Sequence, residues 1–222
     1  MSYILHIDTA TERAHVSLAK DGLLLQAMEN DQQKDHAAFV QTGIQQLLYD
    51  AGISFEPVAA IAVTAGPGSY TGLRVGMASA KGLCYALNKP LIAVNTLEVM
   101  AKAAQTQAAM NDVLYCPMID ARRMEVFTAI YNNDMETVMG PAALILDENS
   151  YGAHLQKNKI HFFGSGSSKW QQVCRDSNAV FINLFDLPAA FTALSYYYYN
   201  QNKFSDLAYS EPYYIKEFKT NT

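Results

Sequence analysis

One glycine-rich stretch carries most of the fold information in this 222-residue chain: Ala65-Gly66-Pro67-Gly68-Ser69-Tyr70-Thr71-Gly72-Leu73-Arg74-Val75-Gly76. The residues before it, 58–64, are almost all apolar and predict a buried strand, while residues 71–87 have helical periodicity. Gly66 and Gly68 allow backbone angles that other residues avoid, and the proline between them stiffens the turn. A strand that turns sharply into a helix is typical of an α/β fold.

The start of this predicted helix is also a candidate anion site. Ser69 or Thr71 can cap the helix, and its free backbone N–H groups and positive dipole end attract phosphate or carboxylate. We therefore expect Gly66, Gly68, Ser69 and Thr71 to be candidate anion-binding residues. The alternative, a tight turn with no ligand, stays open. The stretch is not a P-loop, because no Gly-Lys-Ser/Thr follows the glycines.

The predicted helix carries small residues at spacings of three and four, namely Gly72, Gly76, Ser79, Ala80 and Gly82. Each glycine in a helix interior costs about 1 kcal/mol relative to alanine, so close approach of another element is the expected compensation. That element could be the protein's own sheet. It could also be a helix of another subunit, in which case the predicted helix at 35–51 would flank the interface. Both explanations stay open at this point.

The remaining pattern predicts a mixed α/β protein with two lobes. The first half is predicted to have strands at 4–8, 14–19, 23–29, 58–64 and 91–94 and helices at 35–51, 71–87 and 97–109. The second half is predicted to have strands at 113–119, 125–131, 161–163 and 180–183 and helices at 167–175 and 189–201.

Composition excludes several classes of protein. Half of the residues are hydrophobic and 17% are charged, which argues against a disordered chain, and no apolar run approaches the roughly 20 residues of a membrane helix. The N-terminus predicts a first strand instead of a signal peptide, and the three scattered cysteines predict a cytoplasmic protein without disulfides. A net charge of −5 lacks the broad basic face of a nucleic-acid-binding protein, so another subunit would do most of any RNA binding.

Residues 66–76, Gly-Pro-Gly-Ser-Tyr-Thr-Gly-Leu-Arg-Val-Gly, resemble the signature of the TsaB family, which is related to the metal-bearing TsaD enzymes and was formerly labelled glycoprotease. Weaker matches follow in order along nearly the whole chain. They comprise Asp8–Glu12 with Val16–Leu18, Val94–Glu98, Ile119–Val126, Gly164–Gly166 and Glu211–Lys216.

This resemblance implies an actin-like (ASKHA) α/β fold with two lobes, at 1–102 and 103–222. In that superfamily the hairpin that matches Asp8–Glu12 usually faces nucleotide phosphates, so Thr9 and Thr11 join the candidate anion-binding residues. A nucleotide-hydrolysing member also needs a second phosphate loop, Asp-x-Gly-Thr/Ser. This chain has Asp120-Ala121-Arg122-Arg123 there, which argues against ATP hydrolysis. The two arginines could instead contact an anion or form salt bridges with another subunit, and the alternative that one of them only lies in solvent at a hairpin tip stays open.

Metal and protease chemistry are also disfavoured. TsaD enzymes carry two histidines four residues apart on a helix. In this chain the residue four positions after His36 is Val40 and not a histidine. A metal site needs several converging ligands, and no nearby histidine in the sequence could activate Ser69. We therefore expect no catalytic residue, no metal and no cofactor on this chain, with ATP and metal bound by partner subunits. The alternatives are an actin-like nucleotide-dependent transferase and an M22-type metallopeptidase.

The resemblance implies a non-catalytic scaffold needed for threonylcarbamoyl transfer to N6 of adenosine 37 in tRNAs that read ANN codons. Its partners would be a TsaD-type catalytic subunit, which it activates, and a TsaE-type ATPase. It would meet tRNA only indirectly through the complex, and it would form a homodimer when alone. A self-dimerising regulator without a TsaD-type partner is a further alternative. The predicted interface residues lie on the two helices: His36, Phe39, Val40, Gly43, Gly72, Val75, Gly76, Ser79 and Ala80.

Overall fold

The computed structural model describes residues 2–32, 35–108, 112–183 and 186–216. Contacts within the chain group it into two units, Met1–Val99 with Asp186–Tyr213, and Met100–Phe185 with Tyr214–Thr222. The first unit therefore contains a segment from near the C-terminus, unlike the predicted division at residue 102. No helix in the described ranges has both the length and the apolarity that crossing a membrane requires.

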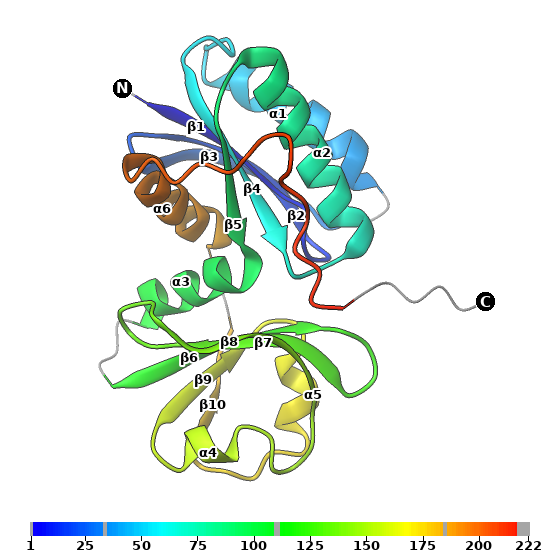
Figure 1. The fold of residues 1–222 in the computed structure, drawn as a ribbon, viewed down its shortest axis with the longest axis vertical. Coiled ribbons are helices and arrows are strands. Elements are labelled where there is room, and N and C mark those ends of the chain that lie inside the picture. Colours follow the sequence, from blue (N-terminus) through cyan, green and yellow to red (C-terminus); the bar gives the residue numbers. More distant parts are fainter. Residues whose placement is uncertain (1, 33–34, 109–111, 184–185, 217–222) are drawn as a thin grey trace, which may run out of the picture. The chain divides into compact units, whose positions relative to one another are not determined.

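The first unit is built on a five-stranded sheet of order β3-β2-β1-β4-β5 (Figure 1). The strands are β1 (Tyr3–Asp8), β2 (Ala14–Lys20), β3 (Leu23–Asn30), β4 (Val58–Gly66) and β5 (Leu91–Asn95). The first three form an antiparallel meander, and β4 and β5 continue it in parallel with β1. Asp21 and Gly22 make the two-residue β2–β3 turn with φ of +49° and +81°, a conformation that Asp-Gly adopts readily.

Helices cover both faces of this sheet. Helices α1 (His36–Asp50) and α2 (Tyr70–Leu87) pack on one face, where Leu5 and Ile7 of β1 point. Helix α6 (Leu187–Asn200) packs on the other face through Phe191 and Leu194, against Ile4 and its neighbours. The alternation of β1 side chains between two cores explains why all of its residues from Ile4 onward are buried.

The predicted meander and the three predicted helices of the first half are confirmed with ends shifted by one or two residues. The third helix, α3, is Thr96–Ala108, and its predicted last residue, Ala109, lies outside the described residues. The tyrosine run 196–199 in α6 is divided between the core and the surface. Tyr198 is buried and donates its hydroxyl to Glu98 at 2.7 Å, whereas Tyr197 is exposed.

The second unit has its own five-stranded sheet of order β10-β9-β6-β7-β8. Its strands are β6 (Val113–Asp120), β7 (Glu125–Tyr131), β8 (Thr137–Ile145), β9 (Lys159–Phe163) and β10 (Ala179–Phe181). Short helices α4 (Gly152–Leu155) and α5 (Ser167–Gln171) pack with this sheet around Trp170 and Phe162, whose ring centroids lie 4.5 Å apart.

Two predictions for this unit were incomplete. The sequence reading missed β8, because Gly140-Pro141 interrupts its pattern; β8 is an edge strand, where proline is tolerated. The predicted helix 167–175 ends at Gln171, four residues early. Its last predicted turn instead brings Cys174 into the core through a bond from its N–H to the Trp170 carbonyl.

Candidate functional site

The first hairpin sits directly on the glycine-rich loop. The N–H of Ser69 donates to the carbonyl of Ala10 at 2.7 Å, and a Cβ on Gly68 would overlap that same carbonyl. A Cβ on Gly66 would lie 2.5 Å from the Tyr213 carbonyl, and the Tyr213 N–H donates to Ala65 at 2.6 Å. The loop is therefore enclosed by two other segments of the same chain.

The glycines at the start of α2 are in equally close contact with the hairpin. A Cβ on Gly72 would overlap the carbonyl of Thr9, and a Cβ on Gly76 would overlap the Thr9 hydroxyl. That hydroxyl donates to the Gly72 carbonyl at 2.6 Å, which ties the hairpin to the helix. On α1, a Cβ on Gly43 would lie 2.8 Å from Val16. Packing against the chain's own sheet and hairpin thus explains these three glycines without any partner.

The candidate anion-binding residues use their polar groups within the chain. Ser69 caps α2 by accepting from the Gly72 N–H at 3.3 Å, and its own N–H is taken by Ala10. Thr9 is buried and turned toward the helix, and the Thr11 hydroxyl donates to the Arg13 carbonyl at 3.1 Å. Thr71 is exposed on the first turn of α2. The carbonyl of Ala10 in the hairpin occupies the space above Gly68, and anion binding at these residues stays a prediction.

Most of the predicted interface residues lie inside the first unit. Six are buried and three are half-buried: His36, Val40, Gly43, Gly72, Gly76 and Ala80, then Phe39, Val75 and Ser79. Their helical spacing reflects the core face of each helix, which packs on the sheet. Small and apolar residues are common to cores and interfaces alike, so their burial leaves little of these side chains for a partner, and an interface on these helices stays a prediction.

The outward face of α2 presents a different set of residues. Arg74, Ala78, Gly82 and Tyr85 are exposed at spacings of four, four and three, so they share one side of the helix. Tyr85 is 83% exposed, and a Cβ on Gly82 would meet no atom within 4 Å in the described residues. Intramolecular packing therefore does not explain Gly82. No signal in the sequence separates Gly82 from the other glycines of this helix, because all of them share spacings of three and four with small residues.

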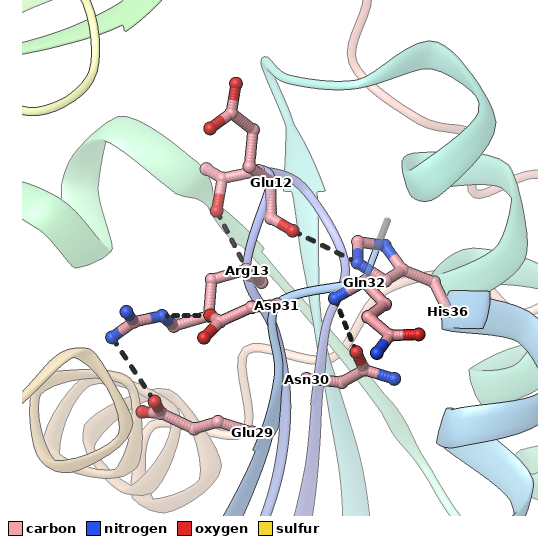
Figure 2. A network of polar contacts seen from close by, with 8 residues as sticks. Glu12, Arg13, Glu29, Asn30, Asp31, Gln32 and His36 are labelled. Atoms are coloured by element: carbon pink, nitrogen blue, oxygen red, sulfur yellow. Dashed lines mark hydrogen bonds and ion pairs between the residues drawn. The ribbon is translucent and has the colours of Figure 1, made fainter. Parts of the chain in front are cut away.

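The residues around His36 do not fit a metal. His36 is buried, and its Nε2 lies 3.2 Å from the carbonyl of Glu12, as Figure 2 shows. Within the described residues, no group of three or more histidine, cysteine or acidic side chains is arranged to hold an ion. His36 instead links the start of α1 to the tip of the β1–β2 hairpin.

The same hairpin is braced by ion pairs across the sheet edge. The Arg13 guanidinium lies 2.7 Å from Asp31 and 3.3 Å from Glu29, so it links the turn between β1 and β2 to the end of β3 (Figure 2). All three side chains are largely exposed, so such pairs contribute little stability. These pairs lie at the same hairpin tip whose Ala10 carbonyl contacts the glycine-rich loop.

A serine–histidine pair exists, but it is sealed inside the protein. Ser195 Oγ on α6 lies 2.7 Å from His6 Nε2 on β1, and both residues are fully buried. Ser195 donates its hydroxyl to the Thr192 carbonyl at 3.0 Å, so its proton is used in a hydrogen bond within α6. Burial lowers the pKa of His6 to about 3, and burial also lowers the pKa of the neighbouring His15 despite the nearby Asp8.

The turn between β6 and β7 contains Arg122 and Arg123, in the segment where a second phosphate loop was sought in the sequence. Arg122 and Arg123 both have positive φ, +70° and +49°, where non-glycine residues cost roughly 1–2 kcal/mol each. The turn is held from beneath, since the Asp120 carboxylate accepts from the Arg122 N–H at 2.6 Å and from Lys169 at 2.7 Å. Partial burial would raise the pKa of Asp120, but these bonds outweigh it and leave that pKa lowered.

Comparison with known proteins places this fold and loop in a family. A family model described as TsaD, tRNA N6-adenosine threonylcarbamoyltransferase, matches residues 25–215. The TsaB protein of tRNA threonylcarbamoyladenosine biosynthesis from Bacillus subtilis is 29% identical over 78% of this chain and 75% of its own length. The Escherichia coli TsaB protein is 38% identical over 59% of this chain, a region that spans about half (55%) of that relative.

Solved structures agree on the fold. A Pseudomonas aeruginosa protein described as similar to the peptidase YEAZ superposes with a TM-score of 0.85 at 25% identity, covering 97% of this chain and 100% of its own. An Arthrobacter polyphosphate/ATP-glucomannokinase superposes with a TM-score of 0.51 at 12% identity, which makes the fold actin-like and says nothing of activity. Because the family model matches most of the chain, this protein belongs to the TsaD family of tRNA N6-adenosine threonylcarbamoyltransferases and, with its closely aligned relatives, to the TsaB type.

Proposed function

We propose that this chain is a non-catalytic subunit that binds and activates a TsaD-type catalytic subunit for threonylcarbamoyl transfer to N6 of adenosine 37 in tRNA. A TsaE-type ATPase is the expected third component, and ATP and metal are expected on the partner subunits. When no partner is present, two copies of the chain are expected to pair through the same surface. A role in threonylcarbamoyladenosine biosynthesis follows from the TsaB relatives; the division of labour is our proposal.

The chemistry of the chain supports a role without catalysis. The helix start that could hold an anion is covered by the carbonyl of Ala10, and the second phosphate loop has Arg122 and Arg123 in place of a glycine. His36 uses one ring nitrogen on the Glu12 carbonyl and has no histidine four residues on. These features leave the described residues without an arrangement for metal-assisted or phosphoryl chemistry.

The observation that carries the docking proposal is the outward face of α2, formed by Arg74, Ala78, Gly82 and Tyr85. Gly82 lowers helix stability by about 1 kcal/mol relative to alanine. No neighbouring atom within the described residues requires that this position lack a side chain. A glycine beside an 83% exposed tyrosine provides a close approach and an aromatic anchor together. An α-helix from a partner fits such a face.

Co-purification with the TsaD-type protein of the same organism tests the proposal. The untagged chain should be retained by the tagged partner at a fixed stoichiometry, and the mixture with a TsaE-type ATPase should transfer threonylcarbamoyl to tRNA. The chain alone should transfer none. Transfer by the isolated chain would show that it is an enzyme in its own right, and failure of the two proteins to associate would refute the scaffold role.

A further inference from the structure

The five arginines of this chain differ in what their side chains contact. Arg13 pairs with Asp31 and Glu29, Arg74 stacks over the Tyr70 ring at 4.1 Å, and Arg175 donates to backbone carbonyls of its own turn. Arg122 and Arg123 have no side-chain partner among the residues that the structure describes, and both are exposed. Two adjacent guanidinium groups are therefore left available at the tip of one hairpin.

The backbone at this tip is unusual for its sequence. Arg122 and Arg123 are the one pair of neighbouring non-glycine residues with positive φ in the described ranges. The β2–β3 turn also has two neighbouring residues with positive φ, Asp21 and Gly22, and this pair is suited to that conformation. Strained backbone that is retained with large side chains is concentrated at ligand contacts. The arginine pair is thus unexplained by the turn and calls for a functional reason.

The base of the tip is rigid, which presents the arginines in a fixed place. The Asp120 N–H donates to the Ser165 hydroxyl at 3.0 Å. The Ala121 N–H donates to the Glu125 carbonyl at 3.0 Å, and the Glu125 N–H donates to the Arg122 carbonyl at 3.1 Å. A Cβ on Gly166 would lie 2.6 Å from Val126, so the loop before α5 presses closely against the hairpin. A preorganised backbone beneath the two arginines lowers the entropy lost when a ligand binds.

The local charge is positive although the chain carries −5 overall. The two carboxylates nearest to the tip in sequence are each paired with a lysine, Asp120 with Lys169 at 2.7 Å and Glu125 with Lys216. The four cations of this group outnumber its two carboxylates, which leaves the excess charge on the unpaired arginines. An exposed pair of guanidinium groups with their acidic neighbours occupied is suited to bidentate contact with phosphate.

We propose that Arg122 and Arg123 bind phosphate groups of the tRNA backbone when the chain acts in its complex. This inference rests on the proposed function, because that function makes tRNA the polyanion present. It adds one direct contact to a chain whose net charge led us to expect only indirect contact with tRNA. The contact is local and independent of base sequence, so it positions the tRNA and adds affinity without selecting among tRNAs.

An acidic surface of a partner protein is the competing ligand for the same two arginines. Salt dependence and side-chain chemistry separate the two cases. Phosphate contacts release counterions, so each one lost should reduce the slope of log affinity for tRNA against log salt by roughly one. A protein contact would instead change the affinity of the subunits for each other and leave tRNA affinity of the assembled complex unchanged.

The test uses the double variant Arg122→Asn/Arg123→Gly, whose residues tolerate positive φ, so that folding is preserved. Its matched control is Arg175→Gln, which removes one exposed arginine from the same unit. Binding of tRNA is measured at several salt concentrations with each variant in complex with the TsaD-type subunit. The double variant should bind about tenfold more weakly at low salt with a shallower salt slope, while thermal unfolding stays the same or occurs at higher temperature. The Arg122→Lys/Arg123→Lys variant should keep the slope and recover only part of the affinity.

Two results would overturn the inference: tRNA affinity and slope in the double variant equal to those of Arg175→Gln, or loss of subunit association with unchanged tRNA binding per complex. A second measurement does not need the complex. In NMR spectra of the full chain at low salt, adding tRNA should shift the Nε–H signals of Arg122 and Arg123 but not that of Arg175. If the chain fails to bind a TsaD-type protein, the proposed function falls, and these signals alone decide whether the arginines bind RNA.

Discussion

At the scale of single residues, two glycines of α2 have different structural roles. A Cβ on Gly72 would overlap the carbonyl of Thr9, whereas a Cβ on Gly82 would meet nothing within 4 Å. The first glycine is required by the chain's own hairpin, and the second lowers helix stability without an internal benefit. Spacing along the sequence could not separate them, because both lie at positions where small residues recur.

We predict opposite effects of the same substitution at these two positions. Gly82→Ala should raise the free energy of unfolding by about 1 kcal/mol, because alanine restores helix propensity in open space. Gly72→Ala should lower it by about 1–3 kcal/mol, because the methyl group displaces the hairpin. Urea denaturation of the purified chain measures both. A destabilising Gly82→Ala would mean that this position is packed, contrary to the geometry.

At the scale of elements, α2 has one buried face and one exposed face. Its inner face packs on β4 and β1 through Leu73, Met77 and Ala80, while Arg74, Ala78, Gly82 and Tyr85 face outward. The glycine-rich stretch predicted the strand, the turn and the helix within one or two residues, since each depends on local periodicity and turn chemistry. Local patterns do not say which side of a helix the sheet covers, so the predicted interface residues fell mostly on the core face.

A bulky residue on the outward face should disrupt association while leaving the fold intact. Gly82→Leu is expected to weaken self-association and binding to the TsaD-type partner by about tenfold or more, because the side chain blocks close helix approach. Gly140→Leu is the matched control, since a Cβ on Gly140 in β8 also meets nothing within 4 Å. Analytical ultracentrifugation and a pull-down give the two affinities. Unchanged association in Gly82→Leu, with Gly140→Leu behaving as wild type, would place the interface elsewhere.

At the scale of the whole molecule, the chain returns to its first unit near the end. Helix α6 covers the face of the first sheet that α1 and α2 leave open, and it encloses His6 together with Ser195. Phe191 of α6 contacts both buried histidines, with ring centroids 5.0 Å from His6 and 6.2 Å from His15. A division at residue 102 could not anticipate this, because the packing joins segments almost 190 residues apart.

This buried histidine predicts a pH dependence of stability. The pKa of His6 is about 3 in the folded chain and 6.5 when unfolded, so the folded state excludes the proton. The stabilisation is complete above pH 6.5 and is lost as pH falls toward 3, and His6 alone changes the unfolding equilibrium by roughly tenfold per pH unit in this range. His15, whose pKa is also lowered, adds in the same direction.

Comparison of the wild-type chain with His6→Gln measures this contribution. The variant loses a hydrogen bond and should be less stable at pH 7, but its free energy of unfolding should fall less steeply between pH 6 and pH 4. The difference in slope isolates His6 from the carboxylates, which titrate in both proteins. Parallel curves for the two proteins would show that His6 does not exclude the proton.

The sequence alone determined the secondary structure around Ala65–Gly76, the order of strands and helices in the first half, and the family, because these follow from local periodicity, turn residues and a specific motif. It also revealed that the second phosphate loop and the histidine pair are absent. Only the tertiary structure decided that Thr9 and Ala10 fill the space above the glycines, that Gly82 remains open and that Arg122 and Arg123 lack side-chain partners in the described chain. Each of these depends on contacts between segments far apart in sequence, and the burial and pairing of a side chain are set by those neighbours.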